Sequence, residues 1–265
     1  MQFIRIDGVT ISYEVTTADP ANPALVLINS LGTDSRIWHL VVPKFAEDFT
    51  VITYDKRGHG LSDLGDPPYR IEDHVADLAG LLDHLEFSEV ILCGLSVGGL
   101  IAQGLYAQRP DLVKAMVLSD TAHKIGTADM WNTRIAAIEE NGIGAILEDI
   151  MSRWFTAPFR SADNGAYRGY CNMLERQPVA GYTGTCAAIR DADFTQQAKA
   201  IRVPVLCVVG EQDGSTPPDL VRSLANLIDD AQFEVLDGAA HIPCAEVPAA
   251  FAATVRSFIV NETKD

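Results

Sequence analysis

Short, continuous apolar runs recur along the chain, and apolar residues at helical spacing fill many of the intervals between them. The clearest helical pattern lies in residues 71–85, with apolar positions at Val75, Leu78, Leu81, Leu82 and Leu85. Strands that are apolar at every position, alternating with amphipathic helices, are typical of a mostly parallel sheet covered by helices on both faces. The strands predicted in this way are 24–28, 50–54, 90–93, 113–118, 203–209 and 232–236.

The N-terminal residues show strand alternation instead. Apolar and polar residues alternate in 2–6 and in 9–15, on either side of Asp7-Gly8. This pattern predicts a β-hairpin that adds two antiparallel strands at one edge, giving an eight-stranded α/β sheet.

Five helices are predicted outside residues 122–195, and Pro43 shortens the first of them. These helices are 38–45, 71–85, 96–108, 217–228 and 246–259.

The alternation stops between Ala122 and Thr195, where helical segments follow one another with no convincing strand between them. We therefore expect a core of residues 1–121 and 196–265 with a helical cap, residues 122–195, inserted into it. An insertion after the C-terminal end of a strand would lie over the edge where open α/β sheets bind ligands. The helices predicted in the cap are 127–140, 144–155, 164–174 and 179–190.

The residues from Val90 to Leu100 predict a buried strand, a very tight turn and the start of a helix. Gly94 to Gly98 fits the G-x-S-x-G pattern of a nucleophile elbow, and the strand before it and the helix after it are the context that this pattern requires. Glycines are needed where side chains would clash with the neighbouring strand and helix. The alternative is an inert serine in a glycine-rich turn. The context favours Ser96 as a nucleophile.

A serine nucleophile needs a base, and the base needs an acid to orient it. Of the six histidines, only His123 and His241 follow Ser96, and His241 comes directly after the last predicted strand. Asp213 follows the preceding strand and is the best candidate for the acid. Asp120 and Glu211 are its rivals. We therefore predict Ser96, Asp213 and His241 as the catalytic residues.

Two backbone N–H groups are expected to bind the oxyanion. One belongs to Val97, the residue after the nucleophile, and the other to Leu31 in the loop after an early strand. The glycine-rich segment from Arg57 to Gly60 resembles a basic or catalytic site, but we favour a structural turn held by local hydrogen bonds. No phosphate-binding glycine loop is present, and the chemistry predicted here requires no metal or organic cofactor.

Composition restricts the partners and the compartment. The 265 residues carry a formal charge of -16, so nucleic acid and anionic membrane surfaces are poor candidate partners. The N-terminus lacks the apolar core of a signal peptide, and no apolar run is long enough to cross a bilayer. Five scattered cysteines with no C-x-x-C spacing favour a reducing cytoplasm.

Over nearly its whole length the chain resembles the α/β-hydrolase superfamily. The resemblance rests on the elbow, on Asp213 and His241, on the turn from Asp55 to Ser62, and on the strand order and inserted cap. Members of this superfamily that place an aspartate at the elbow, the haloalkane dehalogenases and epoxide hydrolases, do not fit Ser96.

Within the superfamily the chain is most similar to 3-oxoadipate enol-lactonases. The signs are the segment from Asn29 to Trp38, the segment from Gly94 to Gly99, and the short cap. These features recur in related esterases and perhydrolases. The resemblance implies that a carboxylate-bearing lactone is hydrolysed through an acyl-enzyme in the catabolism of aromatic compounds.

An anionic substrate in so acidic a protein requires a local cation. The predicted substrate-binding residues are Arg134, Trp131 and Trp154. Six arginines lie in the cap, at 134, 153, 160, 168, 176 and 190. The alternatives are another serine-dependent carboxylesterase, a perhydrolase, a carbon–carbon bond hydrolase, or a non-catalytic ligand sensor. The oligomeric state is left open.

Overall fold

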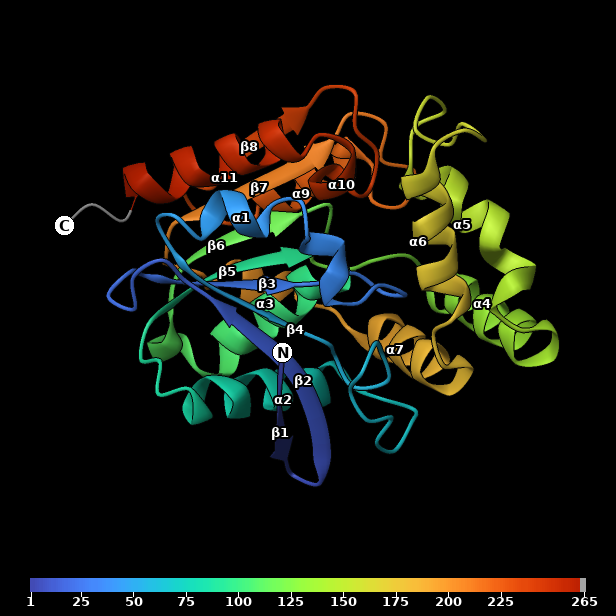
Figure 1. The fold of residues 1–265 in the computed structure, drawn as a ribbon, viewed down its shortest axis with the longest axis horizontal. Helices are drawn as coiled ribbons and strands as arrows, with labels where there is room; N and C mark the ends of the chain where they lie inside the picture. Colours follow the sequence, from blue (N-terminus) through green and yellow to red (C-terminus); the bar gives the residue numbers. More distant parts are fainter. Residues whose placement is uncertain (263–265) are drawn as a thin grey trace.

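The computed structural model describes residues 1–262, and its strands form one eight-stranded sheet with the order β1-β2-β4-β3-β5-β6-β7-β8 (Figure 1). The hairpin strands β1 and β2 are antiparallel, and β2 also pairs antiparallel with β4. All other neighbours are parallel. The predicted sheet is confirmed. Its strands are β1 Gln2–Ile6, β2 Val9–Thr16, β3 Ala24–Ile28, β4 Thr50–Tyr54, β5 Val90–Leu95, β6 Val113–Ser119, β7 Val205–Gly210 and β8 Gln232–Leu236.

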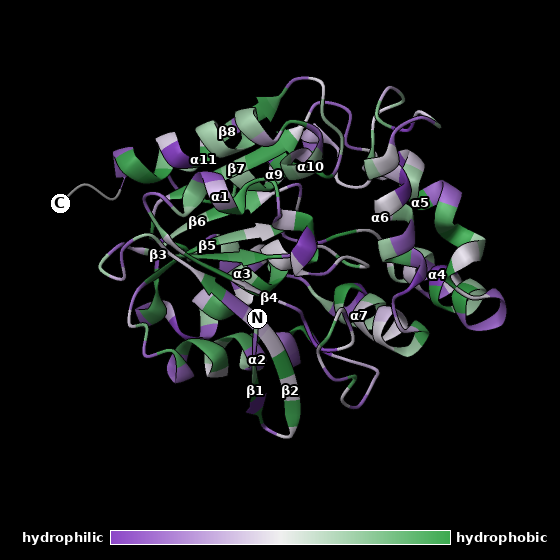
Figure 2. Cartoon of the chain, viewed as in Figure 1, coloured by the Kyte–Doolittle hydropathy of each residue, from purple (hydrophilic) through white to green (hydrophobic). Residues whose placement is uncertain are grey.

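The central strands are apolar at almost every position because helices cover both of their faces. Every residue of β3, β4, β5 and β7 is buried, and Figure 2 shows β3, β5 and β7 as largely hydrophobic. In the parallel register of β3 and β5, Ile28 lies opposite Gly94. The carboxyl ends of these two strands therefore lie side by side.

Helices pack against both sides of the sheet (Figure 1). On one side α3 lies against β3, β5 and β6 and packs against α2. On the other side α11 packs against α1 and β6. Helix α9 contacts β7 and β8, and because it connects neighbouring parallel strands in the same direction as α3, it lies on the side of α2 and α3. The helices of this part of the chain are α1 Val42–Phe45, α2 Ile71–His84, α3 Val97–Gln108, α8 Thr195–Ala198, α9 Pro218–Ala225, α10 Pro243–Glu246 and α11 Pro248–Glu262.

Five α-helices lie between β6 and β7 in the sequence, and the first four of them stand beyond one edge of the sheet, on the right of Figure 1. These four are α4 Ala128–Asn141, α5 Leu147–Trp154, α6 Gly165–Glu175 and α7 Val179–Asp191. Backbone contacts hold α7 against the turn after β4. A Cβ added at Gly181 would lie 2.1 Å from the Gly58 carbonyl oxygen, and the Tyr69 N–H donates to the Gly184 carbonyl at 3.3 Å.

Two predicted helices are wrong in their extent, and proline explains both. The segment 38–45 is a 3-10 turn, Ser35–Trp38, followed by the single turn of α1, because Pro43 lacks an N–H and fits only the first turn of a helix. The segment 246–259 contains the end of α10 and most of α11. Pro248 begins α11.

Smaller 3-10 turns complete the described chain. Residues Pro110–Leu112 follow α3, and Ile143–Ile146 precede α5, where the sequence suggested a helix from residue 144. None of the helices within residues 1–262 combines the length and the apolar character needed to cross a membrane.

Candidate active site

Ser96 occupies the sharp turn between β5 and α3, in a backbone conformation that L-residues seldom adopt. Its φ and ψ angles are 58° and -116°, which costs on the order of 1–3 kcal/mol. The neighbouring β6 segment holds this turn. The Ser96 N–H donates to the Ser119 carbonyl at 2.9 Å, and the Thr121 hydroxyl donates to the Ser96 carbonyl at 2.6 Å. These bonds fix the elbow that the sequence predicted.

The glycines of the elbow allow backbone segments to touch. A Cβ added at Gly98 would lie 2.1 Å from the Ile28 carbonyl oxygen, and one added at Gly94 would lie 2.3 Å from the Gly98 carbonyl oxygen. Any side chain at these positions would therefore separate α3 from β3 or β5. The N-terminus of α3 is thereby placed beside the loop that follows β3.

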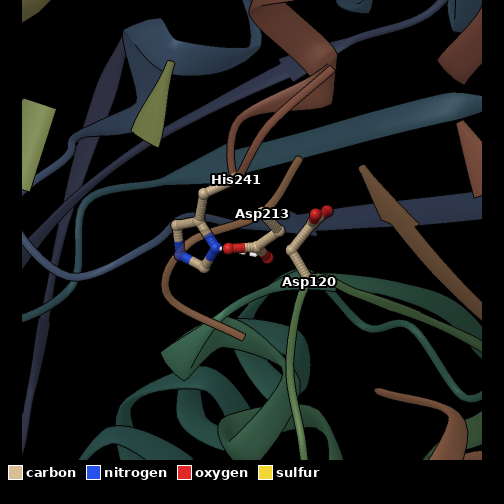
Figure 3. A group of neighbouring side chains, drawn as sticks. All are labelled: Asp120, Asp213 and His241. Carbon is tan, nitrogen blue, oxygen red and sulfur yellow. Dashed lines mark hydrogen bonds and ion pairs between the residues drawn. The ribbon is translucent and has the colours of Figure 1, made fainter. Parts of the chain in front are cut away.

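His241 and Asp213 form a buried pair at the carboxyl ends of β8 and β7 (Figure 3). The His241 Nδ1 lies 2.8 Å from the Asp213 Oδ2. Asp213 also accepts from the Ser215 N–H, the Thr216 N–H and the Thr216 hydroxyl, at 2.7, 3.0 and 2.7 Å. A carboxylate that only accepts hydrogen bonds requires the proton of neutral His241 on Nδ1. The opposite nitrogen, Nε2, is then free to accept a proton.

Asp120, the first rival acid, is fully buried after β6 but makes different contacts. Its Oδ1 accepts from the Gly210 N–H at 2.9 Å, and its Oδ2 accepts from the Ser119 hydroxyl at 2.5 Å. Figure 3 shows Asp120 beside the pair, with the hydrogen bond running from His241 to Asp213. Burial, and then the negative charge of Asp213, raise the pKa of Asp120 well above its ordinary value. The second rival, Glu211, is exposed.

The side chains of Asp120, Asp213 and His241 are also close enough to be considered as metal ligands. One ligand atom from each lies within 4.8 Å of the others. The Asp213 and Asp120 oxygens already accept hydrogen bonds from backbone and hydroxyl donors, and His241 Nδ1 bonds to Asp213. The two carboxyl groups and His241 Nδ1 therefore already have hydrogen-bond partners within the protein. This is the arrangement expected where a carboxylate orients an imidazole.

Ser96 and His241 line a pocket of about 70 Å3 between the carboxyl edge of the sheet and the inserted helices. Leu31 contributes to the wall from the loop after β3. The predicted residues Arg134, Trp131 and Trp154 line it from α4 and α5. Its other walls are formed by Ser30, Ile125, Gly126, Met130, Ile150, Arg153, Tyr182, Ile189, Ser215 and Thr216.

The two backbone N–H groups predicted to bind an oxyanion lie on adjacent segments. Val97 is the first residue of α3, and Leu31 lies in the loop after β3 that α3 touches. Neither N–H donates to another group within residues 1–262. The next N–H along the loop, that of Gly32, donates to His59 Nε2 at 3.1 Å. His59 thus supports this loop, in addition to the local bonds of its own turn.

The cationic side of the pocket is built on α4. The Arg134 guanidinium lies 4.8 Å from the centre of the Trp131 ring, within range of a cation–π contact. The indole N–H of Trp131 donates to the Ile125 carbonyl at 2.7 Å, which fixes the ring. Trp154 is 5% exposed and forms part of the wall.

Arg153 and Tyr182 are among the polar pocket residues that were not selected from the sequence. Arg153 of α5, which pairs with Asp149 at 2.9 Å, was one of six arginines in residues 122–195, and helical spacing alone did not indicate which of them face the pocket. Tyr182 of α7 is buried, and its hydroxyl has no hydrogen-bond partner in the described chain. Burial raises the pKa of Tyr182, against the opposing positive charge of Arg134.

The raised pKa of Asp120 predicts how stability depends on pH. Asp120 ionises near pH 4 in the unfolded chain but only at a higher pH in the folded protein. The protonated Asp120 therefore stabilises the fold fully below pH 4, and this stabilisation is lost as the pH rises through the folded-state pKa. Asparagine mimics the protonated carboxyl and does not titrate. We expect the Tm of Asp120→Asn, relative to wild type, to increase between pH 4 and pH 7. Calorimetry across this range measures the difference in Tm, and a difference that does not change with pH would contradict the raised pKa of Asp120.

Comparisons with known proteins agree with this architecture. A family model for the alpha/beta hydrolase fold matches residues 23–248. The 3-oxoadipate enol-lactonase 2 of Acinetobacter baylyi is 34% identical over 248 residues, covering 94% of this chain and 92% of that protein. The crystal structure of the enol-lactonase from Burkholderia xenovorans LB400 gives a TM-score of 0.94 at 33% identity, covering 98% of this chain and 100% of that one. The resemblance predicted from the sequence is confirmed, and this chain belongs to the α/β-hydrolase fold family.

Proposed function

We propose that this protein hydrolyses 3-oxoadipate enol-lactone to 3-oxoadipate, with Ser96, His241 and Asp213 as its catalytic residues. The observation that carries the proposal is one small pocket in which Ser96, the oriented His241 and the cation of Arg134 meet. The similarity to enol-lactonases over more than nine-tenths of the chain supports the choice of substrate.

The reaction begins when Ser96 attacks the lactone carbonyl carbon. His241 Nε2 removes the hydroxyl proton, and Asp213 stabilises the imidazolium through its hydrogen bond to Nδ1. The negative charge on the former carbonyl oxygen is bound by the N–H groups of Leu31 and Val97. A donor of this kind contributes ~3 kcal/mol of transition-state stabilisation.

Collapse of the tetrahedral intermediate breaks the ring carbon–oxygen bond and leaves an acyl ester on Ser96. The leaving group is an enol, which takes its proton from His241 and becomes a ketone by tautomerisation, so that ring opening is hard to reverse. His241 then removes a proton from water, which attacks the ester carbon, and it returns this proton to the Ser96 Oγ as the bond between that oxygen and the acyl carbon breaks. The products are 3-oxoadipate and free Ser96.

The free carboxylate of the lactone requires an anchor, because the protein as a whole carries a formal charge of -16. We propose Arg134 as the main anchor, with Trp131 and Trp154 as pocket walls. Arg153 and the unpaired Tyr182 hydroxyl line the same pocket and are placed to add hydrogen bonds. We also propose that residues 122–195 act as a cap over the sheet edge.

The proposed activity suggests a role in the catabolism of aromatic compounds through the β-ketoadipate pathway. The five cysteines are all free and buried, which is compatible with the cytoplasmic location that we propose.

Substitution of the two buried aspartates tests the assignment of the acid. We expect Ser96→Ala to abolish hydrolysis, and Asp213→Asn to lower kcat by about 10⁴-fold because neutral His241 would adopt the wrong tautomer. Asp120→Asn is the matched control, because it changes the neighbouring carboxyl, and kcat should stay within about threefold of wild type. Steady-state kinetics measures all three variants. Equal losses in the two aspartate variants would refute the assignment.

Kinetics on two substrates test the carboxylate anchor. For Arg134→Ala we expect KM for the enol-lactone to rise by about 10- to 100-fold, the range typical of a lost hydrogen bond to a charged group. Hydrolysis of p-nitrophenyl acetate, which has no carboxylate, should change little. Arg168→Ala is the control, because that exposed arginine does not line the pocket.

The same measurement separates the proposed function from a general esterase. A wild-type preference for the lactone over the acetate supports the proposal. Efficient hydrolysis of the acetate with poor hydrolysis of the lactone would refute it, while leaving Ser96, Asp213 and His241 in their roles.

A further inference from the structure

Lys56 is a buried cation directly behind the loop that follows β3. It comes two residues after β4 and is 1% exposed. Lysine side chains are almost never buried completely unless they are paired. The Lys56 Nζ donates a hydrogen bond of 2.8 Å to the carbonyl oxygen of Ser30. This bond joins the turn after β4 to the loop that carries Leu31.

The Ser30 carbonyl and the Leu31 N–H belong to the same peptide unit. Because a trans peptide is planar, its C=O and N–H bonds point in opposite directions. Whatever holds the Ser30 oxygen therefore also sets the direction of the Leu31 N–H. Thr33 donates to this oxygen as well, from its hydroxyl at 2.9 Å and from its backbone N–H at 3.3 Å.

The loop is also held on the other side of Leu31. The Gly32 N–H donates to His59 Nε2 at 3.1 Å, and this nitrogen accepts only when it carries no proton. Burial, and then the positive charge of Lys56, lower the pKa of His59 well below its ordinary value. His59 therefore remains neutral, and the peptides on both sides of the Leu31 residue are fixed.

Charged groups surround Lys56 from several segments. Burial lowers the pKa of Lys56 to about 7, while the carboxylates of Asp55 and Asp34 oppose that shift. Burial, and then the positive charge of Lys56, lower the pKa of both His59 and His74. A positive charge on the carbonyl side of a peptide increases the polarisation of its N–H, since hydrogen bonds in a chain strengthen one another.

We infer that Lys56 is a positioning residue for the oxyanion: its buried amino group, through the hydrogen bond to the Ser30 carbonyl, holds the Ser30–Leu31 peptide with the Leu31 N–H directed at the carbonyl oxygen of the bound ester. The inference rests on the proposed attack by Ser96 and requires no particular lactone. Lys56 does not line the pocket, so it acts through the peptide and not by contact with the substrate.

Kinetics of Lys56→Met tests this role, since methionine keeps most of the length of the side chain and removes the donor. With p-nitrophenyl acetate we expect kcat to fall by about 10- to 100-fold and KM to stay within about twofold, because a misdirected oxyanion donor weakens transition-state binding. Inhibition by a boronic acid, which forms a tetrahedral adduct on Ser96, should weaken by a similar factor.

Two further variants keep the test decisive. Thr33→Val removes a second donor from the same oxygen and should lower kcat in the same direction by a smaller factor, even if Lys56→Met does not fold. Asp77→Asn is the control for destabilisation. It breaks the buried pair in which the Arg57 Nε lies 2.7 Å from Asp77, without touching the Ser30 carbonyl. Its Tm should fall while its kcat stays within about twofold of wild type.

The outcomes separate the role of Lys56 from the proposed function. A folded Lys56→Met with kcat within twofold of wild type would overturn the role, and so would an equal loss of kcat in Asp77→Asn. Hydrolysis by the Ser96→Ala variant at the wild-type rate would overturn the proposed function itself. Loss of kcat at constant KM in Lys56→Met and Thr33→Val, but not in Asp77→Asn, would establish the role.

Discussion

The contact between Gly98 and the Ile28 carbonyl is the constraint on which the rest of the site depends. Because α3 begins against the end of β3, the N–H of Val97 and the loop that contains Leu31 become neighbours although they are far apart in the sequence. The same tight crossing forces Ser96 into its left-handed conformation. The bonds from β6 to the Ser96 backbone then hold a turn that would be unfavourable in isolation.

Buried ionisable groups form a second layer around this contact. Three of them have a defined partner within the protein: Asp213 pairs with His241, Asp120 with the Gly210 N–H, and Lys56 with the Ser30 carbonyl. Burying such groups is costly unless their hydrogen bonds are made. The edge of the sheet is therefore organised by polar groups that have defined partners, whereas the strands behind it are apolar.

The sequence was sufficient for the features that follow from local pattern. Continuous apolar runs located the central strands, and the elbow pattern with His241 after the last strand identified the residues that the structure brings to one pocket. The choice between Asp213 and Asp120 is different, because both follow strands. Only the three-dimensional position of the His241 ring distinguishes them.

Features that depend on which face of a helix packs against the core could not be predicted from the sequence pattern. Arg153 and Tyr182 lie on helices whose inward faces are set by packing, and Lys56 resembled one more charge in a polar turn. The helix expected from Trp38 to Phe45 failed for a local reason, because Pro43 allows only a first turn.

The close approach of Gly58 and Gly181 has a consequence for how this scaffold can diverge. At that point α7 and the core meet backbone to backbone, so neither position accepts a side chain and α7 is a fixed wall of the pocket. The residues contributed by α4 and α5 carry no such restriction from this contact. New substrate preferences are therefore most accessible to evolution through substitutions on α4 and α5, while α7 preserves the docking of the inserted segment.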